Sequence, residues 1–260
     1  MKVVILCGGQ GTRIRDVNEN LPKPMIPVGN LPILWHIMKY YSMAGHKDFV
    51  LCLGYKGQVI KDFFLNYESN TRDFSLTLGA ANRIEYHTEH EEIDWRVTLA
   101  DTGADAMTGA RVRKIRKYIG DDEHFMLTYG DGVGDIDIGK LVDFHKSHGR
   151  ILTVSGVRPP GRFGELMHAP DGMVTEFNEK PQATGGRISG GYFVCSRKIF
   201  DYLDDGDDLV FETEPMRRLV ADGQMMTYQH DGFWQPMDTY RDYMYLNGLA
   251  AKGEAPWIKW

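Results

Sequence analysis

A glycine-rich segment follows the first apolar run of the chain, and its residue types suit phosphate binding. The apolar run is Lys2–Leu6, and Gly8-Gly9-Gln10-Gly11-Thr12-Arg13 comes shortly after it. Glycines let backbone N–H groups approach phosphate oxygens closely, and a guanidinium adds a forked donor with a permanent charge. The dinucleotide-binding pattern GxGxxG fails at Ile14, and no lysine stands where a P-loop needs one. A tight turn that binds nothing stays open as the alternative, because such turns are frequent.

A single lysine stands between two prolines, in Pro22-Lys23-Pro24-Met25. The prolines restrict the backbone on both sides of Lys23, so its ammonium loses less entropy on binding an anion than that of a freely moving surface lysine. Taken alone, the motif fits a proline-rich turn with a solvated lysine equally well. Its position shortly after the glycine-rich segment favours a lysine that contacts phosphate.

A carboxylate follows another apolar run, Phe125–Tyr129, in the sequence Gly130-Asp131-Gly132. Sheets of α/β proteins bind ligands at the C-terminal ends of their strands, and carboxylate oxygens suit a hard metal ion there. A turn-forming role for Asp131 is the alternative. The position at a strand end favours a metal ligand.

Other reactive arrangements have little support in the sequence. No Ser-His-Asp or Cys-His arrangement is convincing, and the nine histidines contain no HxH or HExxH pair. The three cysteines, Cys7, Cys52 and Cys195, are far apart and include no CxxC pair, so we expect reduced thiols. The chemistry is therefore expected to depend on positioned charges.

Strand-like and helix-like runs alternate along the first half of the chain, and these elements must position the residues above. Strands are expected at Lys2–Leu6, Phe49–Leu53, Ser75–Leu78, Val97–Asp101 and Phe125–Tyr129, and helices at Leu34–Ala44, Gly57–Asn66 and Gly109–Tyr118. The alternation predicts an α/β fold with a Rossmann-like, mostly parallel central sheet and helices on both faces.

The second half is expected to be richer in strands. We expect a helix at Ile138–His148, a strand at Ile151–Val157, a hairpin at Gly164–Glu179, a strand at Gly190–Cys195 and a helix beginning near Glu214. The charged stretch Arg83–Arg96 is interpreted as a surface insertion whose role the sequence leaves open.

Composition narrows the class of partner. A formal net charge of -6 gives no overall basic field, which argues against nucleic acid as the main partner. No run approaches the roughly 18 apolar residues of a membrane span, and the apolar start lacks the pattern of a signal peptide, so we expect a cytoplasmic protein without a membrane partner.

The motifs together resemble the signature of the sugar nucleotidylyltransferases. That signature is GGxGTR followed by PKPM, and both match residue for residue at Gly8–Arg13 and Pro22–Met25. The resemblance continues through Tyr129–Gly132, Glu179–Pro181, Gly190-Gly191 and Trp234–Thr239, so it spans almost the whole chain. The departures are conservative: Cys7 stands where alanine is usual, and Ala110 where glycine is common.

The resemblance implies an in-line attack by a sugar-phosphate oxygen on the α-phosphorus of a nucleoside triphosphate. It implies one domain over residues 1–260, with a nucleotide-binding part at about 1–135 and a β-rich sugar-binding and C-terminal part at about 136–260. It assigns catalytic roles to Arg13, Lys23, Asp131 and Lys180, and a Mg²⁺ ion to Asp131 and Asp238. Glu179, Lys180, Gly191 and Trp234 are expected to contact the sugar and its phosphate. The nucleotide is expected at Leu6, Cys7, Gly8, Gly9, Gln10, Gly11, Thr12, Arg13, Lys23, Ala106, Thr108, Gly109, Arg111 and Gly130.

Within this family, the chain is most similar to members that use CTP and glucose 1-phosphate, through Leu34–Met38, Asp101–Gly103, Met107–Arg111 and Pro160–Gly164. The implied reaction joins CTP and α-D-glucose 1-phosphate to give CDP-glucose and pyrophosphate, in a homo-oligomeric enzyme. The same reaction with UTP or dTTP stays open. So does a catalytically silent sugar-nucleotide-binding module, although such a module could lose Arg13, Lys23, Asp131 or Asp238, and this chain retains all four.

Overall fold

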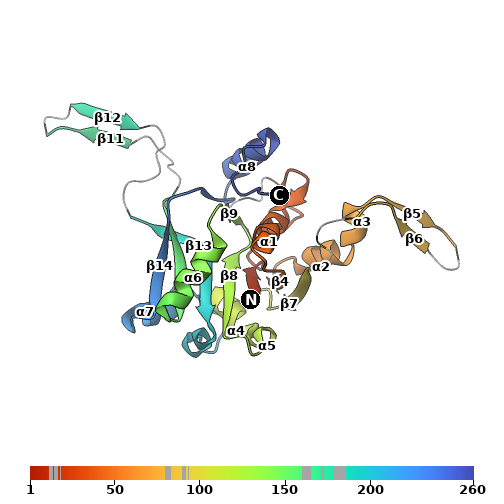
Figure 1. The fold of residues 1–260 in the computed structure, drawn as a ribbon, viewed down its shortest axis with the longest axis horizontal. Coiled ribbons are helices and arrows are strands. Elements are labelled where there is room, and N and C mark those ends of the chain that lie inside the picture. The colour runs from red at the N-terminus through yellow and green to blue at the C-terminus, as the bar shows by residue number, and fades with distance from the viewer. Residues whose placement is uncertain are drawn as a thin grey trace.

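A seven-stranded sheet forms the centre of the molecule, in the order β14-β10-β13-β8-β1-β4-β7 (Figure 1). The computed structural model describes the chain except for residues 12, 13, 15, 16, 18, 80–82, 90, 91, 93, 160–164, 171, 172 and 179–185. The strands are β1 (Val3–Leu6), β4 (Asp48–Leu53), β7 (Arg96–Asp101), β8 (His124–Tyr129), β10 (Leu152–Val157), β13 (Ile188–Ser196) and β14 (Met225–His230). All run in one direction except β13, which is antiparallel to its neighbours β8 and β10. The predicted α/β class with a mostly parallel sheet is confirmed.

The two faces of this sheet pack against different sets of helices. Successive side chains of a strand point to opposite faces, so Val3 and Ile5 belong to one hydrophobic cluster and Val4 and Leu6 to the other. The first cluster includes buried residues of α1 (Ile33–Met43), α2 (Gly57–Leu65), α6 (Ile138–His148) and α8 (Tyr240–Lys252). The second includes residues of α4 (Thr108–Lys114), α5 (Arg116–Ile119), the 3₁₀ helix η3 (Arg197–Tyr202) and α7 (Glu214–Ala221). Helices therefore cover both faces, as predicted.

Three expectations about individual elements were wrong or incomplete. The expected strand Ser75–Leu78 does not enter the central sheet: β5 (Phe74–Thr77) pairs with β6 (Arg83–Tyr86) in a separate hairpin that projects beyond α3 (Tyr67–Thr71) (Figure 1). The expected helix Gly109–Tyr118 is divided into α4 and α5 at Ile115. Neither β14 nor α8 was predicted, because β14 is an edge strand with much of its surface exposed and α8 buries little besides Leu246.

The predicted hairpin of the second half is present as β11 (Glu165–His168) and β12 (Val174–Asn178). Its expected turn residues Asp171 and Gly172, and its outer ends Gly164 and Glu179, lie outside the described residues. In the described part of the chain, no helix is both long enough and apolar enough to cross a membrane.

The stretch Arg83–Arg96, whose role the sequence left open, is exposed at its start and buried near its end. Glu92 accepts a hydrogen bond from Lys39 Nζ at 2.5 Å, and the two side chains are 6% and 5% exposed. Trp95 packs against Phe49 of β4 and Trp35 of α1. The end of this stretch is therefore packed against the core, whereas its hairpin extends into solvent.

A histidine in the last turn of α6 has a perturbed pKa. His145 is 1% exposed. Its Nδ1 atom is 2.8 Å from Thr153 Oγ1, and its Nε2 atom is 3.2 Å from His124 Nδ1. Burial is the main reason that its pKa falls to about 4 from an ordinary value of 6.5, and the nearby His124 and His148 lower it further. The folded protein therefore holds this imidazole neutral.

We predict that the free energy of unfolding falls as the pH falls from about 6.5 to 4. In that pH range His145 takes up a proton in the unfolded chain but stays neutral in the folded chain. The free energy of unfolding should therefore be about 3 kcal/mol lower at pH 4 than at neutral pH. Urea unfolding of the wild type and His145→Gln across this range measures the effect. A pH dependence of equal size in both proteins would contradict the assignment to His145.

Candidate active site

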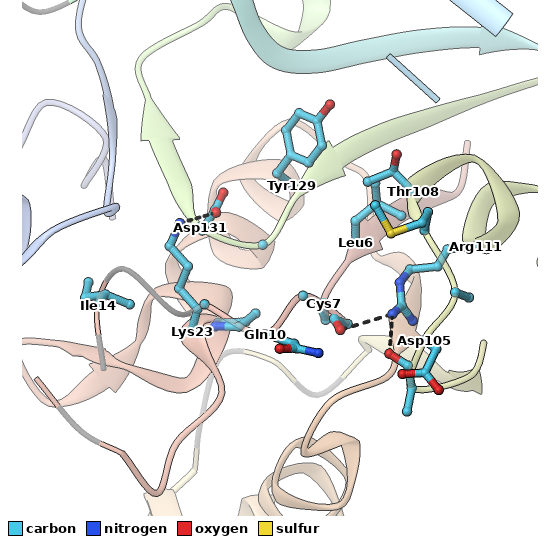
Figure 2. A pocket seen from close by; sticks show the side chains of 18 of the residues that line it. Leu6, Cys7, Gln10, Ile14, Lys23, Asp105, Thr108, Arg111, Tyr129 and Asp131 are labelled. Atoms are coloured by element: carbon cyan, nitrogen blue, oxygen red, sulfur yellow. Dashed lines mark hydrogen bonds and ion pairs between the residues drawn. The ribbon is translucent and has the colours of Figure 1, made fainter. Parts of the chain in front are cut away.

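A cavity of about 470 Å³ opens where β1 and β8 end. The loop Cys7–Gly11 lies along its middle, with Lys23, Asp131 and Asp238 on one side and Asp105, Thr108 and Arg111 on the other. Figure 2 shows Lys23 turned toward Asp131, and Arg111 and Asp105 at the opposite end. The cavity therefore has two chemically different ends joined by a glycine-rich loop.

The structure brings together most of the residues that the sequence singled out. Those that line the cavity are Leu6, Cys7, Gly8, Gly9, Gln10, Gly11, Lys23, Ala106, Thr108, Arg111, Gly130, Asp131 and Asp238. Gly109, Gly191 and Trp234 are not part of this lining. Thr12, Arg13, Glu179 and Lys180 lie outside the described residues.

Six further lining residues were not among the predicted site residues. Pro24, Met107 and Tyr129 belong to motifs that the sequence displayed, whereas Ile14, Ala104 and Asp105 were missed altogether. Each is next to, or within two residues of, one that was chosen, so proximity to the motifs was the available signal. Burial raises the pKa of the Cys7 thiol well above its ordinary value, and the neighbouring Cys52 adds to the shift. Cys7 is therefore protonated at neutral pH and is no nucleophile.

Lys23 begins a single 3₁₀ turn, η2 (Lys23–Met25), that the two prolines shape. Pro22 is extended, and its carbonyl accepts from Met25 N at 2.8 Å. Gly11 crosses the stem of Lys23 so closely that a Cβ on Gly11 would lie 3.0 Å from Lys23 Cβ. Gly11 also has a φ of +56°, which suits glycine. The glycine-rich loop and the proline-framed lysine are thus packed together.

Asp131 and Asp238 meet through a two-stranded ribbon. The strand β9 (Gly132–Gly134) pairs antiparallel with β15 (Trp234–Pro236), and Gly132 lies opposite Pro236. Met237 N donates to Asp131 O at 2.8 Å. This register places the residue before β9 and the residue two positions after β15 at the same end of the ribbon.

The ammonium of Lys23 lies between these two carboxylates. Lys23 Nζ is 2.5 Å from Asp131 Oδ2 and 2.5 Å from Asp238 Oδ1. Burial alone would lower the pKa of Lys23, but the charges of the two aspartates and the hydrogen bonds to them outweigh it and raise the pKa above 10.5. Lys23 therefore stays charged at neutral pH.

A third carboxylate, that of Asp242, holds the backbone of Asp238 in place. Asp242 Oδ2 accepts from Asp238 N at 3.1 Å and from Thr239 N at 2.9 Å, and Thr239 closes a capping box at the start of α8. Sequence reasoning missed Asp242. The signal was present, because Thr239 followed three residues later by Asp242 is a capping-box pattern.

The two aspartates form a donor set that fits a magnesium ion. Asp131 Oδ2 and Asp238 Oδ1 are both 2.5 Å from one nitrogen, so they face the same small volume. Mg²⁺ takes hard oxygen ligands at about 2.0–2.1 Å and commonly binds one or two carboxylates together with substrate phosphates and water. The described residues contain no group of three or more His, Cys, Asp or Glu side chains suited to a metal. A metal here would therefore need oxygen ligands from a phosphate or from water.

At the other end of the cavity, the Arg111 guanidinium is bonded to the protein itself. Arg111 is 4% exposed, and its Nη1 lies within hydrogen-bond distance of Leu53 O, Thr102 Oγ1 and Gly103 O at 2.7–2.9 Å. Its Nη2 donates to Gly8 O at 3.1 Å and Ala104 O at 3.3 Å. Burial lowers its pKa from 12.5. A charge that the sequence assigned to the nucleotide thus also joins the loops after β1, β4 and β7.

Glycines leave the space that this guanidinium occupies. A Cβ on Gly8 would overlap the guanidinium, and a Cβ on Gly54 would come within 2.5 Å of Arg111 Nη1. Gly8 therefore has a packing role in addition to any contact with a ligand.

Glu212 links the two walls beside Arg111. Its carboxylate accepts from Thr108 Oγ1 at 2.6 Å and from the hydroxyl of Tyr129. Thr108 Oγ1 in turn accepts from Phe211 N at 2.9 Å. Glu212 was missed, and no local motif marks it, because its partners are far away in the sequence.

The three predicted residues outside the lining support its walls. Gly109 packs on Leu209, where a Cβ would lie 2.9 Å from Leu209 O. Gly191 has a φ of +75°, and the Tyr129 ring fills the place of a side chain there. Trp234 Nε1 donates to Gly190 O at 2.7 Å. Gly191 therefore packs against Tyr129, and Trp234 joins the β9–β15 ribbon to the residue before Gly191.

The fold and this cavity define a nucleotide-dependent transferase, and comparison with known proteins agrees. Residues 2–252 match the family described as nucleotidyl transferase, so the chain belongs to that family of enzymes. The family prediction is confirmed.

Individual relatives show which members of the family this chain resembles. The chain is 49% identical to glucose-1-phosphate cytidylyltransferase of Salmonella typhi over 261 residues, covering 100% of both chains. It is 42% identical to the probable glucose-1-phosphate cytidylyltransferase of Bacillus subtilis, again over 100% of both. Among solved structures, HddC from Yersinia pseudotuberculosis complexed with GMP-PN has a TM-score of 0.68 at 24% identity, covering 95% of this chain and 98% of that one. That structural likeness concerns the fold.

We predict that Arg111→Ala lowers the free energy of unfolding by about 3 kcal/mol. The substitution removes a buried charged donor and leaves carbonyls of three loops without their partner. Lys117→Ala, which removes an exposed charge from the neighbouring helix, is the matched control and should change stability by less than about 0.5 kcal/mol. Urea denaturation followed by circular dichroism measures both. Equal stability of the two variants would show that the Arg111 bonds are dispensable for the fold.

Proposed function

We propose that this protein is a glucose-1-phosphate cytidylyltransferase that uses Mg²⁺. The reaction joins CTP and α-D-glucose 1-phosphate and releases CDP-glucose and pyrophosphate. The observation that carries the proposal is the convergence of Lys23, Asp131 and Asp238 at one end of a cavity whose middle is a glycine-rich loop. Identity of 49% over the full length to a glucose-1-phosphate cytidylyltransferase supports the choice of substrates.

The reaction needs charge neutralisation more than covalent catalysis. An anionic sugar phosphate must approach the α-phosphorus of another anion, so positioned cations and N–H donors supply the catalysis. Lys23 provides a partly buried ammonium that is charged at neutral pH, on a turn fixed by prolines. The backbone of Gly8–Gly11 borders the same space and supplies donors that can follow a phosphate chain. Arg13, which follows this loop in the sequence, is proposed to add a second cation.

Asp131 and Asp238 are proposed to hold the magnesium ion. When bound, Mg²⁺ neutralises phosphate oxygens and orients them for in-line displacement. Asp242 fixes the backbone of Asp238, and the hydrogen bond from Met237 N fixes that of Asp131. The protein thus positions both carboxylates through backbone contacts before any substrate arrives.

The base is proposed to lie at the Arg111 end. Cytosine presents an exocyclic amine and a ring acceptor where uracil presents a carbonyl and a donor, so a site built for one leaves buried groups unpaired with the other. The backbone of Ala104–Met107 and the side chain of Thr108 line this end. Arg111 is proposed to act on the base partly through the loops that it holds, since both of its terminal nitrogens already donate to protein oxygens.

The sugar is proposed to bind beyond Asp131. Gly191 packs against Tyr129, and Trp234 belongs to the β9–β15 ribbon and bonds to Gly190 O. Lys180 with Glu179 would contact the sugar phosphate and hydroxyls. We also propose a cytoplasmic homo-oligomer. Exposed apolar side chains on the β5–β6 hairpin, Phe74, Leu76 and Ile84, support contact with a second copy.

The decisive experiment measures pyrophosphate release with each nucleoside triphosphate against a panel of sugar 1-phosphates. We expect the highest kcat/KM with CTP and glucose 1-phosphate. Equal efficiency with UTP or dTTP would remove the cytidylyl assignment and leave nucleotidyl transfer standing. No release with any pair would favour a catalytically silent module.

We predict that Asp131→Asn and Asp238→Asn each raise the Mg²⁺ concentration needed for half-maximal rate by at least about tenfold, because each removes a charged oxygen ligand. Turnover at saturating Mg²⁺ should also fall. Asp137→Asn, an exposed carboxylate that caps α6, is the control and should leave the Mg²⁺ dependence unchanged. If both site variants keep the wild-type Mg²⁺ dependence, the carboxylate pair is structural.

A further inference from the structure

The Lys23 ammonium occupies the place between the carboxylates that a metal would take. Its nitrogen is 2.5 Å from one oxygen of Asp131 and 2.5 Å from one oxygen of Asp238. Both oxygens belong to the pair assigned above to Mg²⁺, so this inference rests on the proposed function. One cation, the Lys23 ammonium, bridges the two side chains in this structure.

Two cations compete for one oxygen pair in this arrangement. A divalent ion that bound both oxygens would lie within a few ångströms of the ammonium, and two positive charges at that distance repel strongly in a partly buried site. The Lys23 side chain is 11% exposed, and those of Asp131 and Asp238 are 32% and 18% exposed, so water screens this repulsion poorly. The metal can bind both carboxylates well only if Lys23 moves.

The surroundings of Lys23 give the ammonium somewhere to move. Its stem packs on Gly11, while its ammonium lies between the two aspartates. The glycine-rich loop, where the phosphates of a nucleotide are proposed to bind, lines the same cavity, so rotation of the side chain can carry the ammonium toward that loop. The 3₁₀ turn that carries it is fixed by Pro22 and Pro24, so rotation of the side chain is the available motion. A polyphosphate on the loop would offer the ammonium new anionic partners.

We propose that Lys23 blocks the metal site in the substrate-free enzyme and that a nucleoside triphosphate opens it. The nucleotide's phosphates accept the Lys23 ammonium, which releases Asp131 Oδ2 and Asp238 Oδ1 to the metal. The metal and the nucleotide therefore bind with positive coupling, and the free enzyme binds a divalent ion weakly. By linkage, each ligand raises the affinity for the other by the same factor.

The test measures Mn²⁺ binding without nucleotide, by the electron paramagnetic resonance signal of the free ion. We expect weak binding by the wild type and at least about tenfold tighter binding by Lys23→Met, which keeps a long side chain but removes the ammonium from both carboxylates. Lys140→Met, which removes an exposed lysine of α6, should match the wild type. Lys23→Met combined with Asp131→Asn should lose the gain.

A second readout is the melting temperature, which stays informative if Lys23→Met is less stable because it has lost its ion pairs to Asp131 and Asp238. Mg²⁺ should then raise the melting temperature of Lys23→Met by more than that of the wild type. The proposal is overturned if Lys23→Met binds Mn²⁺ no more tightly than the wild type and Mg²⁺ raises the two melting temperatures equally. These measurements need no turnover, so they separate this inference from the substrate assignment. If Lys23→Met binds Mn²⁺ more tightly but the wild type does not use CTP, the inference that Lys23 blocks the metal site stands and the cytidylyl function is wrong.

Discussion

The contact of Lys23 with Asp131 and Asp238 is the interaction on which the site depends. Asp131 lies 108 residues after Lys23 in the chain, and Asp238 lies 215 residues after it. Each segment is fixed independently: Lys23 by the proline-framed turn, Asp131 by its place after β8, and Asp238 by the β9–β15 ribbon and the Asp242 cap. Opposite charges thus meet in a largely buried place because the backbone brings them there. Rotation of the Lys23 side chain can exchange partners without disturbing that backbone.

Arg111 organises the opposite end of the cavity by a different means. None of the ion pairs found among the described residues involves it, and carbonyl oxygens from the loops after β1, β4 and β7 surround it instead. Carbonyl dipoles satisfy the guanidinium donors while leaving its positive charge only partly compensated. The same contacts tie together three loops that must keep their spacing if a base is to fit between them. One side chain therefore holds several segments of the cavity wall together, and Gly8 and Gly54 provide the space for it.

Solved structures and sequence relatives resemble this chain at different levels. A solved structure with 24% identity and a TM-score of 0.68 shares the fold, which accommodates many nucleotides and sugars. Relatives at 42–49% identity over their full length share the family. The chemistry of phosphate handling follows from charges that the geometry displays. The choice of base, in the proposed function, depends on a few polar groups near Arg111, where small differences decide which donors and acceptors stay unpaired.

The sequence by itself determined the fold class, the order of most strands and helices, and the two loops at the end of β1 and β8. Periodicity, glycines and prolines act locally, so these features can be read from short segments. The family resemblance paired Asp131 with Asp238, but only the tertiary structure showed that the β9–β15 ribbon brings them together. Only the tertiary structure decided that Asp242 holds the backbone of Asp238 and that Glu212 links Tyr129 with Thr108. It also decided that the β5 strand leaves the central sheet and that Arg111 bonds to the protein. Those outcomes depend on the pairing of distant strands and on the burial of particular side chains, and no local pattern encodes which distant backbone oxygen a buried donor will reach.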